Sequence, residues 1–253
     1  MKEQRNIGIF DSGIGGVTVL KEIIKILPKE NYIYFSDSAN NPYGDRKEKE
    51  VIEICDNIVE YLIKRNCKAI VIACNTASAK AVGYLRKKYK NIPIIAIEPA
   101  YKMVHDYAYE DPTLVMATKG TIESEKFSLL LKKYNNYKTY LLPCIGLADI
   151  IEEGNKEKIE KYLSTNLGIY KGKVKNVVLG CTHYPLIEDK IRKVLGNVKF
   201  FNGAPNLAMH LKNVLTEKES LDENSGKIEF IDSQGLKSKE IRFFNILNKY
   251  GNE

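Results

Sequence analysis

Two cysteines stand where apolar, strand-like segments end and polar runs begin. Cys74 ends the stretch AIVIAC and opens CNT, whereas Cys181 ends VVLGC and opens CTH. A helix start or a protonated histidine beside a thiol lowers its pKa from the reference value of about 8.5. Both cysteines are therefore candidates for acid, base or nucleophile chemistry.

Several chemistries would use only one of these thiols. A nucleophilic Cys-His pair would take Cys74 or Cys181 as nucleophile and His183 as base, and would leave the other cysteine idle. Zinc takes three or four ligands, often with CxxC spacing, which the sequence lacks, so we expect no metal. Inert, buried thiols are the remaining alternative. We assign three cysteines to this last group: Cys55, Cys67 and Cys144.

A pair of thiols facing one cleft has a different use. One thiol can remove a proton from one face of a carbon while the other returns a proton to the opposite face, which inverts a stereocentre. The α-hydrogen of an amino acid is a very weak acid, so such a site must stabilise the developing negative charge with preorganised donors. Carboxylates or a histidine near each sulfur would relay the protons.

The elements that must position these residues alternate along the chain. The alternation of apolar runs and helical patterns predicts parallel sheets covered by helices. Predicted strands are residues 6–10, 32–35, 69–73, 94–97, 113–117, 140–142, 177–180 and 198–201, and the clearest predicted helices are residues 17–27, 47–64 and 76–89.

The pattern repeats at a constant offset. Thr118 ends a strand 107 residues after Asp11 does, and Cys181 follows Cys74 by the same 107 residues. Either this is a coincidence of α/β regularity or the chain contains two similar α/β halves related by an approximate twofold axis. The second interpretation predicts residues 1–97 plus 207–253 as one domain, residues 98–206 as the other, and the active site in the cleft between them.

The tail at residues 206–253 is expected to return to the first half. It contains a helix-like stretch, a polar link at residues 217–227, a short strand and a last helix. The strand, residues 228–231, would then extend the first sheet at its edge.

Polar residues gather at the predicted strand ends. Ligands of open α/β sheets bind outside the carboxyl ends of the strands, so these residues would line one cleft. They are Asp11, Ser12, Asp37, Cys74, Asn75, Thr76, Thr118, Glu152, Cys181, Thr182 and His183.

The stretch DSGIGG, residues 11–16, matches neither a dinucleotide loop nor a P-loop, because Thr18 stands where GxGxxG has its last glycine and GK[ST] is missing. It is either a structural turn or a helix start whose free N–H groups suit a carboxylate or another anion.

Charge and composition narrow the classes of function. The net charge is +7, but lysines are spread over helix-like segments, which argues against nucleic-acid binding and fits a mild attraction for small anions. No run is long and apolar enough to span a membrane, and the N-terminal residues do not resemble a signal peptide. Five scattered cysteines indicate free thiols in a reducing compartment. We therefore expect a cytoplasmic protein that does not bind membranes.

Six motifs together resemble the glutamate racemases of the aspartate/glutamate racemase superfamily. They are NIGIFDSGIGG, DSANNPYG, ACNTASA, ATKGT, IIEEG and GCTHYPL, in the order of that family. The resemblance implies two α/β domains and a cofactor-independent interconversion of L- and D-glutamate, which supplies D-glutamate for peptidoglycan synthesis. It also implies a homodimer that binds a small molecule.

The resemblance assigns a role to each matching residue. Cys74 and Cys181 would be the two acid/base thiols, assisted by Asp11 and Glu152, with His183 serving Cys181. Contacts to the substrate would come from ten residues: Asp11, Ser12, Tyr43, Gly44, Asn75, Thr76, Thr118, Thr121, Thr182 and His183.

The sequence departs from the family pattern at Asn202-Gly203, where an acidic residue followed by a small one is usual, and at Ser78, where threonine is common. Two other functions stay open. One is racemisation of aspartate or a related acid, because one methylene changes selectivity by only about 1–3 kcal/mol. The other is a binding protein that has lost turnover, against which the presence of both cysteines and both carboxylates argues.

Overall fold

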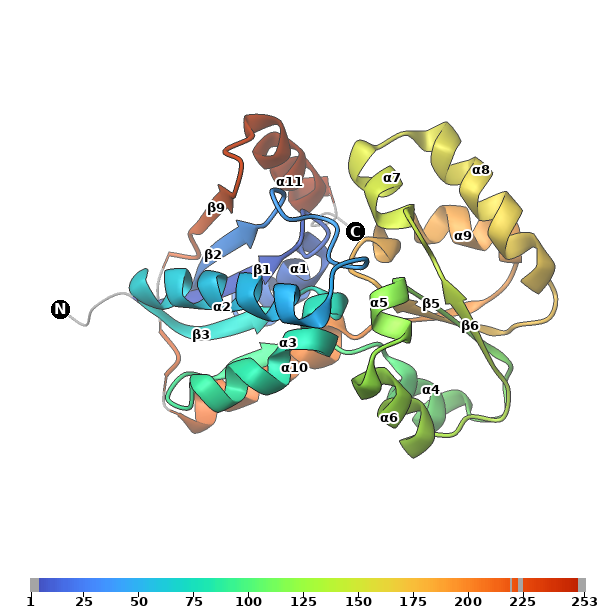
Figure 1. Ribbon diagram of the computed structural model, residues 1–253, viewed down its shortest axis with the longest axis horizontal. Coiled ribbons are helices and arrows are strands. Elements are labelled where there is room, and N and C mark those ends of the chain that lie inside the picture. The colour runs from blue at the N-terminus through green and yellow to red at the C-terminus, as the bar shows by residue number, and fades with distance from the viewer. Residues whose placement is uncertain (1–4, 219, 223–224, 250–253) are drawn as a thin grey trace.

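The computed structural model describes residues 5–218, 220–222 and 225–249, which form two α/β halves side by side (Figure 1). The first half has a parallel sheet in the order β4-β3-β1-β2-β9. Its strands are β1 (Asn6–Asp11), β2 (Asn31–Ser36), β3 (Cys67–Ile72), β4 (Ile94–Ala96) and β9 (Ile228–Asp232). The second half has a parallel sheet in the order β6-β5-β7-β8. Its strands are β5 (Thr113–Ala117), β6 (Thr139–Pro143), β7 (Asn176–Gly180) and β8 (Lys199–Phe201). The predicted fold class is confirmed.

Helices cover both faces of each sheet, so the central strands are mostly apolar and buried. In the first half, one apolar cluster lies under α1, α10 and α11, and another under α2 and α3. These helices are α1 (Val17–Ile26), α2 (Glu48–Lys64), α3 (Asn75–Lys88), α10 (Ala204–Glu217) and α11 (Lys237–Lys249).

The second half is built in the same way, with α4 and α6 on one face of its sheet and α7, α8 and α9 on the other. A short helix, α5, follows β5. The bounds are α4 (Tyr101–Ala108), α5 (Lys119–Ile122), α6 (Glu125–Lys133), α7 (Leu147–Glu153), α8 (Lys156–Leu167) and α9 (Glu188–Leu195). Two 3-10 turns, η1 (Gly168–Tyr170) and η2 (Tyr184–Ile187), complete the half.

The offset of 107 residues corresponds to matching strands. The order β4-β3-β1-β2 in one sheet has its counterpart in β8-β7-β5-β6 in the other. Each central strand pair thus has an equivalent, and the ends of β3 and β7 carry Cys74 and Cys181 at corresponding places.

The end of the described chain packs on the first half. Strand β9 pairs with β2, and α10 and α11 contribute Leu207, Leu211 and Phe243 to the cluster over α1. Helix α10 begins at Ala204, three residues before the predicted boundary at 207. The predicted polar link at residues 217–227 falls partly outside the described residues. The division into two domains at the stated residues stays a prediction.

The chain crosses between the halves twice, after β4 and after β8, and the two crossings touch. A Cβ atom on Gly203 would lie 2.3 Å from the carbonyl oxygen of Glu98, so only glycine fits. Beside it, the Asn202 side chain accepts a hydrogen bond of 2.7 Å from the Ala204 N–H at the start of α10. Gly203 therefore allows the two crossings to come into close contact, and Asn202 binds the start of α10.

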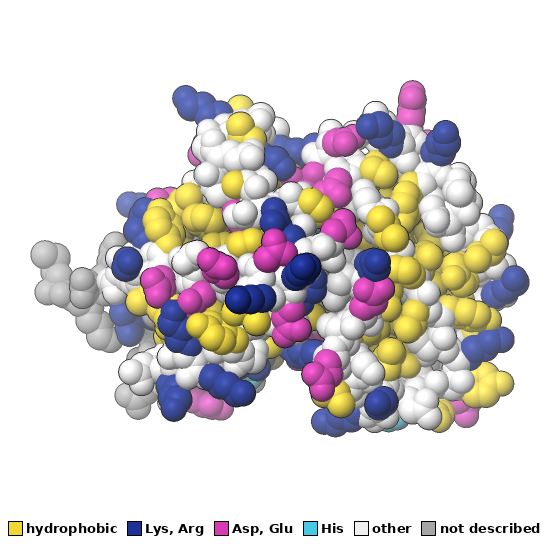
Figure 2. Space-filling model, in the orientation of Figure 1, with side chains coloured by type: hydrophobic (Ala, Val, Ile, Leu, Met, Phe, Trp, Pro, Cys, Tyr) yellow, Lys and Arg dark blue, Asp and Glu magenta, His cyan; other side chains and the backbone are white. Residues whose placement is uncertain are grey.

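The surface agrees with the charge pattern of the sequence. Figure 2 shows lysine and arginine side chains spread over both halves of the visible face, with acidic side chains between them. Among the described residues, no helix has the length and apolar character needed to cross a membrane.

Replacing Gly203 by alanine should destabilise the protein by about 1–3 kcal/mol, because backbone atoms of Glu98 must move to admit the methyl group. Gly83→Ala is the matched control. It lies in α3 with open space around its Cβ position, so alanine should stabilise the helix by about 0.5–1 kcal/mol. Urea unfolding of the three proteins measures both effects. Equal stability of Gly203→Ala and the wild type would contradict the close contact.

Candidate active site

The carboxyl ends of β1, β3, β5 and β7 meet around a cavity of about 50 Å³ between the two halves. The predicted residues line it, with the exception of Asp37, Thr121 and Glu152. Lining residues that we did not predict are Asn41, Pro42, Asp45, Lys119, Cys144, Ile145, Gly146, Ala148 and Asp149. Cys144, which we assigned to the inert, buried thiols, is buried as expected but also lines this cavity.

Cys74 lies at the N-terminus of α3, on the wall that the first half provides. Its Sγ atom is 3.8 Å from the Ser12 Oγ atom, and the side chain is 6% exposed. Burial raises the pKa of Cys74 well above its ordinary value, and the negative charge of Asp11 adds to this rise. The thiol form of Cys74 is therefore favoured at neutral pH.

Cys181 lies on the opposite wall, directly after β7, and is connected through His183 to Glu152. Its Sγ atom is 3.7 Å from Nδ1 of His183. The other ring nitrogen of His183, Nε2, is 2.8 Å from Oε1 of Glu152. His183 is buried, and Glu152 stands behind it at the end of α7, which is why Glu152 does not line the cavity.

The Glu152–His183 pair holds both groups in their charged forms. Burial alone would lower the pKa of His183, but the Cys181 sulfur and the Glu152 carboxylate raise it well above its ordinary value. Burial would raise the pKa of Glu152, yet His183 and Lys239 lower it to about 2. At neutral pH the imidazole therefore carries a proton next to the Cys181 sulfur.

The glycines of the loop at residues 11–16 make room for this pair. A Cβ atom on Gly13 would lie 2.0 Å from Oε1 of Glu152, and one on Gly15 would lie 2.4 Å from Nδ1 of His183. The Ile14 N–H donates to Oε1 of Glu152 at 2.7 Å. Free N–H groups of the loop thus bind a carboxylate, as expected, but the carboxylate belongs to the protein itself.

Asp11 occupies the same loop and connects the two walls. It accepts hydrogen bonds from the N–H groups of Ser12 at 2.9 Å and Gly16 at 2.6 Å, and from the Thr182 hydroxyl at 3.1 Å. Burial raises the pKa of Asp11, and the charge of His183 opposes this rise. Asp11 is therefore a buried carboxyl that has contacts with both halves.

Polar groups on the remaining walls suit an amino-acid substrate. The hydroxyl groups of Thr76 and Thr118 are 2.8 Å apart. The Asn75 side-chain oxygen is buried and has no hydrogen-bond partner among the described residues, so a donor on a ligand would satisfy it. Tyr43 and Gly44 also line the cavity, and the hydroxyl of Tyr43 donates to Asp37 at 2.6 Å.

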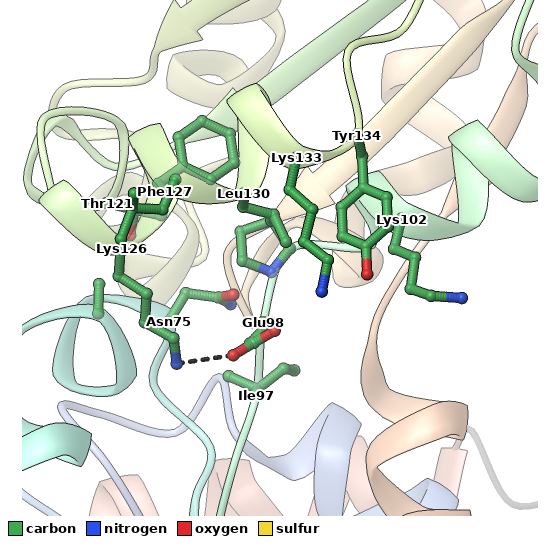
Figure 3. A pocket seen from close by; sticks show the side chains of 13 residues that line it. Asn75, Ile97, Glu98, Lys102, Thr121, Lys126, Phe127, Leu130, Lys133 and Tyr134 are labelled. Carbon is green, nitrogen blue, oxygen red and sulfur yellow. Dashed lines mark ion pairs between the residues drawn. The ribbon is translucent and has the colours of Figure 1, made fainter.

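Thr121 lies one step away from the cavity. Its hydroxyl group is 2.9 Å from that of Thr118, and it lines a second cavity of about 250 Å³ (Figure 3). Lys126 pairs there with Glu98 at 2.7 Å. Thr121 therefore supports Thr118 and does not reach the space between the two thiols.

Two contacts of the site were not predicted from the sequence. Lys239 Nζ donates to Oε2 of Glu152, and the Asn41 side chain donates to Asp149 across the cleft at 2.9 Å. The motif DSANNPYG contained a signal for Asn41, but nothing in the periodicity of α11 identifies Glu152 as a partner of Lys239.

No group of three or more His, Cys, Asp or Glu side chains in the described part of the chain is arranged to hold a metal ion. The expectation that the protein needs no metal or cofactor stays a prediction.

The pKa of His183 should lie above 6.5 in the wild type and fall in Glu152→Gln, because the variant removes the carboxylate that stabilises the imidazolium. Ring resonances of labelled histidine, followed by NMR from pH 5 to 9, measure both values. His105 and His210 serve as internal references, since neither contacts Glu152. An unchanged His183 titration in the variant would contradict the charged pair.

Comparison with known proteins agrees with this geometry. The profile of the Asp/Glu/hydantoin racemase family matches residues 7–211. A glutamate racemase of Clostridium botulinum (strain Alaska E43 / Type E3) is 44% identical over 241 residues, which cover 92% of this chain and 93% of that protein.

Two crystal structures share the fold. Glutamate racemase RacE1 of Bacillus anthracis is 32% identical with a TM-score of 0.85, and the match covers 96% of this chain and 94% of that one. Glutamate racemase of Francisella tularensis in complex with D-glutamate is 33% identical with a TM-score of 0.84 and the same coverage. The chain belongs to the Asp/Glu/hydantoin racemase family.

Proposed function

We propose that the protein interconverts L- and D-glutamate without a cofactor, with Cys74 and Cys181 as its two acid/base groups. The observation that carries the proposal is the position of the two thiols, which follow matching strands of opposite halves and line one small cavity. A substrate held between them presents one face of its α-carbon to each sulfur.

In each turnover, the thiolate on one wall takes the α-proton, and the electron pair stays on the α-carbon and its carboxylate. The thiol on the other wall then gives its proton to the opposite face. One C–H bond breaks, one forms, and the configuration is inverted. General acid–base groups of this kind contribute about 10²- to 10⁴-fold each.

The surroundings of the sulfurs supply the protons. His183 carries the proton that Cys181 exchanges, and Glu152 holds the imidazole in position from behind. Asp11 serves the Cys74 side, where its charge influences the thiol, and its contact with Thr182 connects it to the other wall.

The remaining lining residues hold the substrate. The unpaired oxygen of Asn75 suits the α-ammonium group. Hydroxyl groups of Ser12, Thr76 and Thr118 can donate to the α-carboxylate, on which charge develops in the transition state. The small volume of the cavity favours a substrate of amino-acid size.

The names of the similar proteins favour glutamate over aspartate, since the relatives described above are glutamate racemases. We also propose that the product D-glutamate feeds peptidoglycan synthesis, that the protein works in the cytoplasm as a homodimer, and that it binds neither nucleic acid nor membranes.

Cys74→Ala and Cys181→Ala should each lower the rate of glutamate racemisation by at least about 10²-fold, because each removes one of the two proton carriers. Cys67→Ala is the matched control. It begins the strand that Cys74 follows, is equally buried, and should keep its activity. Circular dichroism follows the optical change of L-glutamate, and L-aspartate serves as the competing substrate. Full activity in either active-site variant would contradict the two-thiol mechanism, whereas turnover of aspartate alone would reassign the substrate.

A further inference from the structure

The last helix, α11, belongs to the first half but contacts the second half across the cleft. Its Phe243 packs in the core of the first half, with the ring centroid 4.5 Å from that of Tyr34. Two basic side chains of the same helix reach α7 of the second half. Lys239 donates to the Glu152 carboxylate, and Arg242 donates to the Ile151 carbonyl oxygen at 2.5 Å. In Figure 1, α11 lies beside α7.

These contacts complete the surroundings of Glu152. Its Oε1 atom faces His183 and the Ile14 N–H, and its Oε2 atom faces Lys239. The carboxylate is therefore held from three segments outside its own helix: the loop after β1, the segment after β7 and α11. Lys239 is the outermost member of a chain that runs through Glu152 and His183 to the sulfur of Cys181.

We propose that Lys239 is a positioning residue for proton transfer at Cys181, acting through Glu152 and His183. This inference rests on the proposed racemase function and adds a residue to it. Lys239 binds Oε2, the oxygen of Glu152 that does not contact His183. This hydrogen bond holds the carboxylate against Nε2 of His183, and the imidazole is held in turn against the Cys181 sulfur.

Burial separates this contact from an ordinary surface ion pair. The side chain of Lys239 is 23% exposed and that of Glu152 is 6% exposed. Exposed ion pairs contribute little to stability. Removing one partner of a buried pair, however, leaves the other charge buried without a counter-charge, which is costly. Lys237, two residues earlier on α11, is exposed and provides a comparison with the same charge.

The contact serves only one of the two walls. Hydrogen bonds to Asp11, on the Cys74 side, come from Ser12, Gly16 and Thr182. None of these donors belongs to α11. Loss of Lys239 should therefore slow proton transfer at Cys181 and leave transfer at Cys74 unchanged.

Rates alone do not reveal this asymmetry. Enantiomers have equal free energies, so the equilibrium constant is one and kcat/KM must fall equally in both directions. For Lys239→Gln we expect a fall of about 10- to 100-fold, by analogy with the range known for removing the hydrogen-bond partners that orient metal-binding side chains. The step that limits the rate must be located in another way.

Primary deuterium isotope effects on kcat/KM locate it. L-glutamate and D-glutamate, each deuterated at the α-carbon, are compared with the unlabelled compounds. In Lys239→Gln, the isotope effect should rise for the enantiomer that Cys181 deprotonates, because that step limits the rate more strongly. It should fall for the mirror-image substrate. Glu152→Gln should shift both effects in the same directions.

Three variants complete the test. Lys239→Arg restores the cation and should return both isotope effects toward the wild-type values, whereas Lys237→Gln should match the wild type. Arg242→Ala removes a contact between α11 and α7 that does not involve Glu152, and should leave the two isotope effects in their wild-type ratio. Thermal unfolding of each variant confirms that the fold is retained.

Isotope effects that move together or do not move in Lys239→Gln would overturn the inference, as would an identical shift in Arg242→Ala. A wild-type protein that does not racemise glutamate would instead contradict the proposed function, so the two failures are distinguishable.

Discussion

The site depends on the close approach of Glu152 and His183 to the loop at residues 11–16. The side chains of Glu152 and His183 fill the space that Gly13 and Gly15 leave free, and the Ile14 N–H donates to the Glu152 carboxylate. Any larger residue at either glycine would separate the halves at the point where the two thiols must share one substrate. The loop is thus the surface on which one half of the active site is assembled against the other.

The two walls are similar in origin but different in electrostatics. Matching strands end at Cys74 and Cys181, yet Cys74 has a buried carboxyl for a neighbour, whereas Cys181 has a protonated imidazole. A carboxyl group and burial favour the thiol, and the imidazolium supplies a proton that the sulfur can exchange. The internal repeat therefore supplies symmetric positions, and the residues that follow each cysteine make the two proton carriers distinct.

The strands, the importance of the two thiols and the polar residues at the strand ends could be predicted from the sequence. Each of these depends on the spacing of apolar residues and on the residue types directly after a strand, which are local properties. The return of the tail to the first sheet at β9 was also visible in a short apolar run. Contacts between remote surfaces were not predictable. The lysine at position 239 has the same helical context as its neighbours, and only the packing of α11 on the first half directs it to Glu152. Thr121 was expected at the substrate; it does not line the cavity between the thiols, and its hydroxyl group lies 2.9 Å from that of Thr118, which does.

The central claim is that two thiols act from opposite faces of one α-carbon. Racemisation of L-glutamate in deuterium oxide, stopped at low conversion, tests it directly, because each sulfur exchanges its proton with solvent separately. Mass spectrometry of the separated enantiomers should find deuterium at the α-carbon of nearly all D-glutamate and of little of the remaining L-glutamate. Equal labelling of the two enantiomers would mean that a single base serves both faces, and would contradict the account.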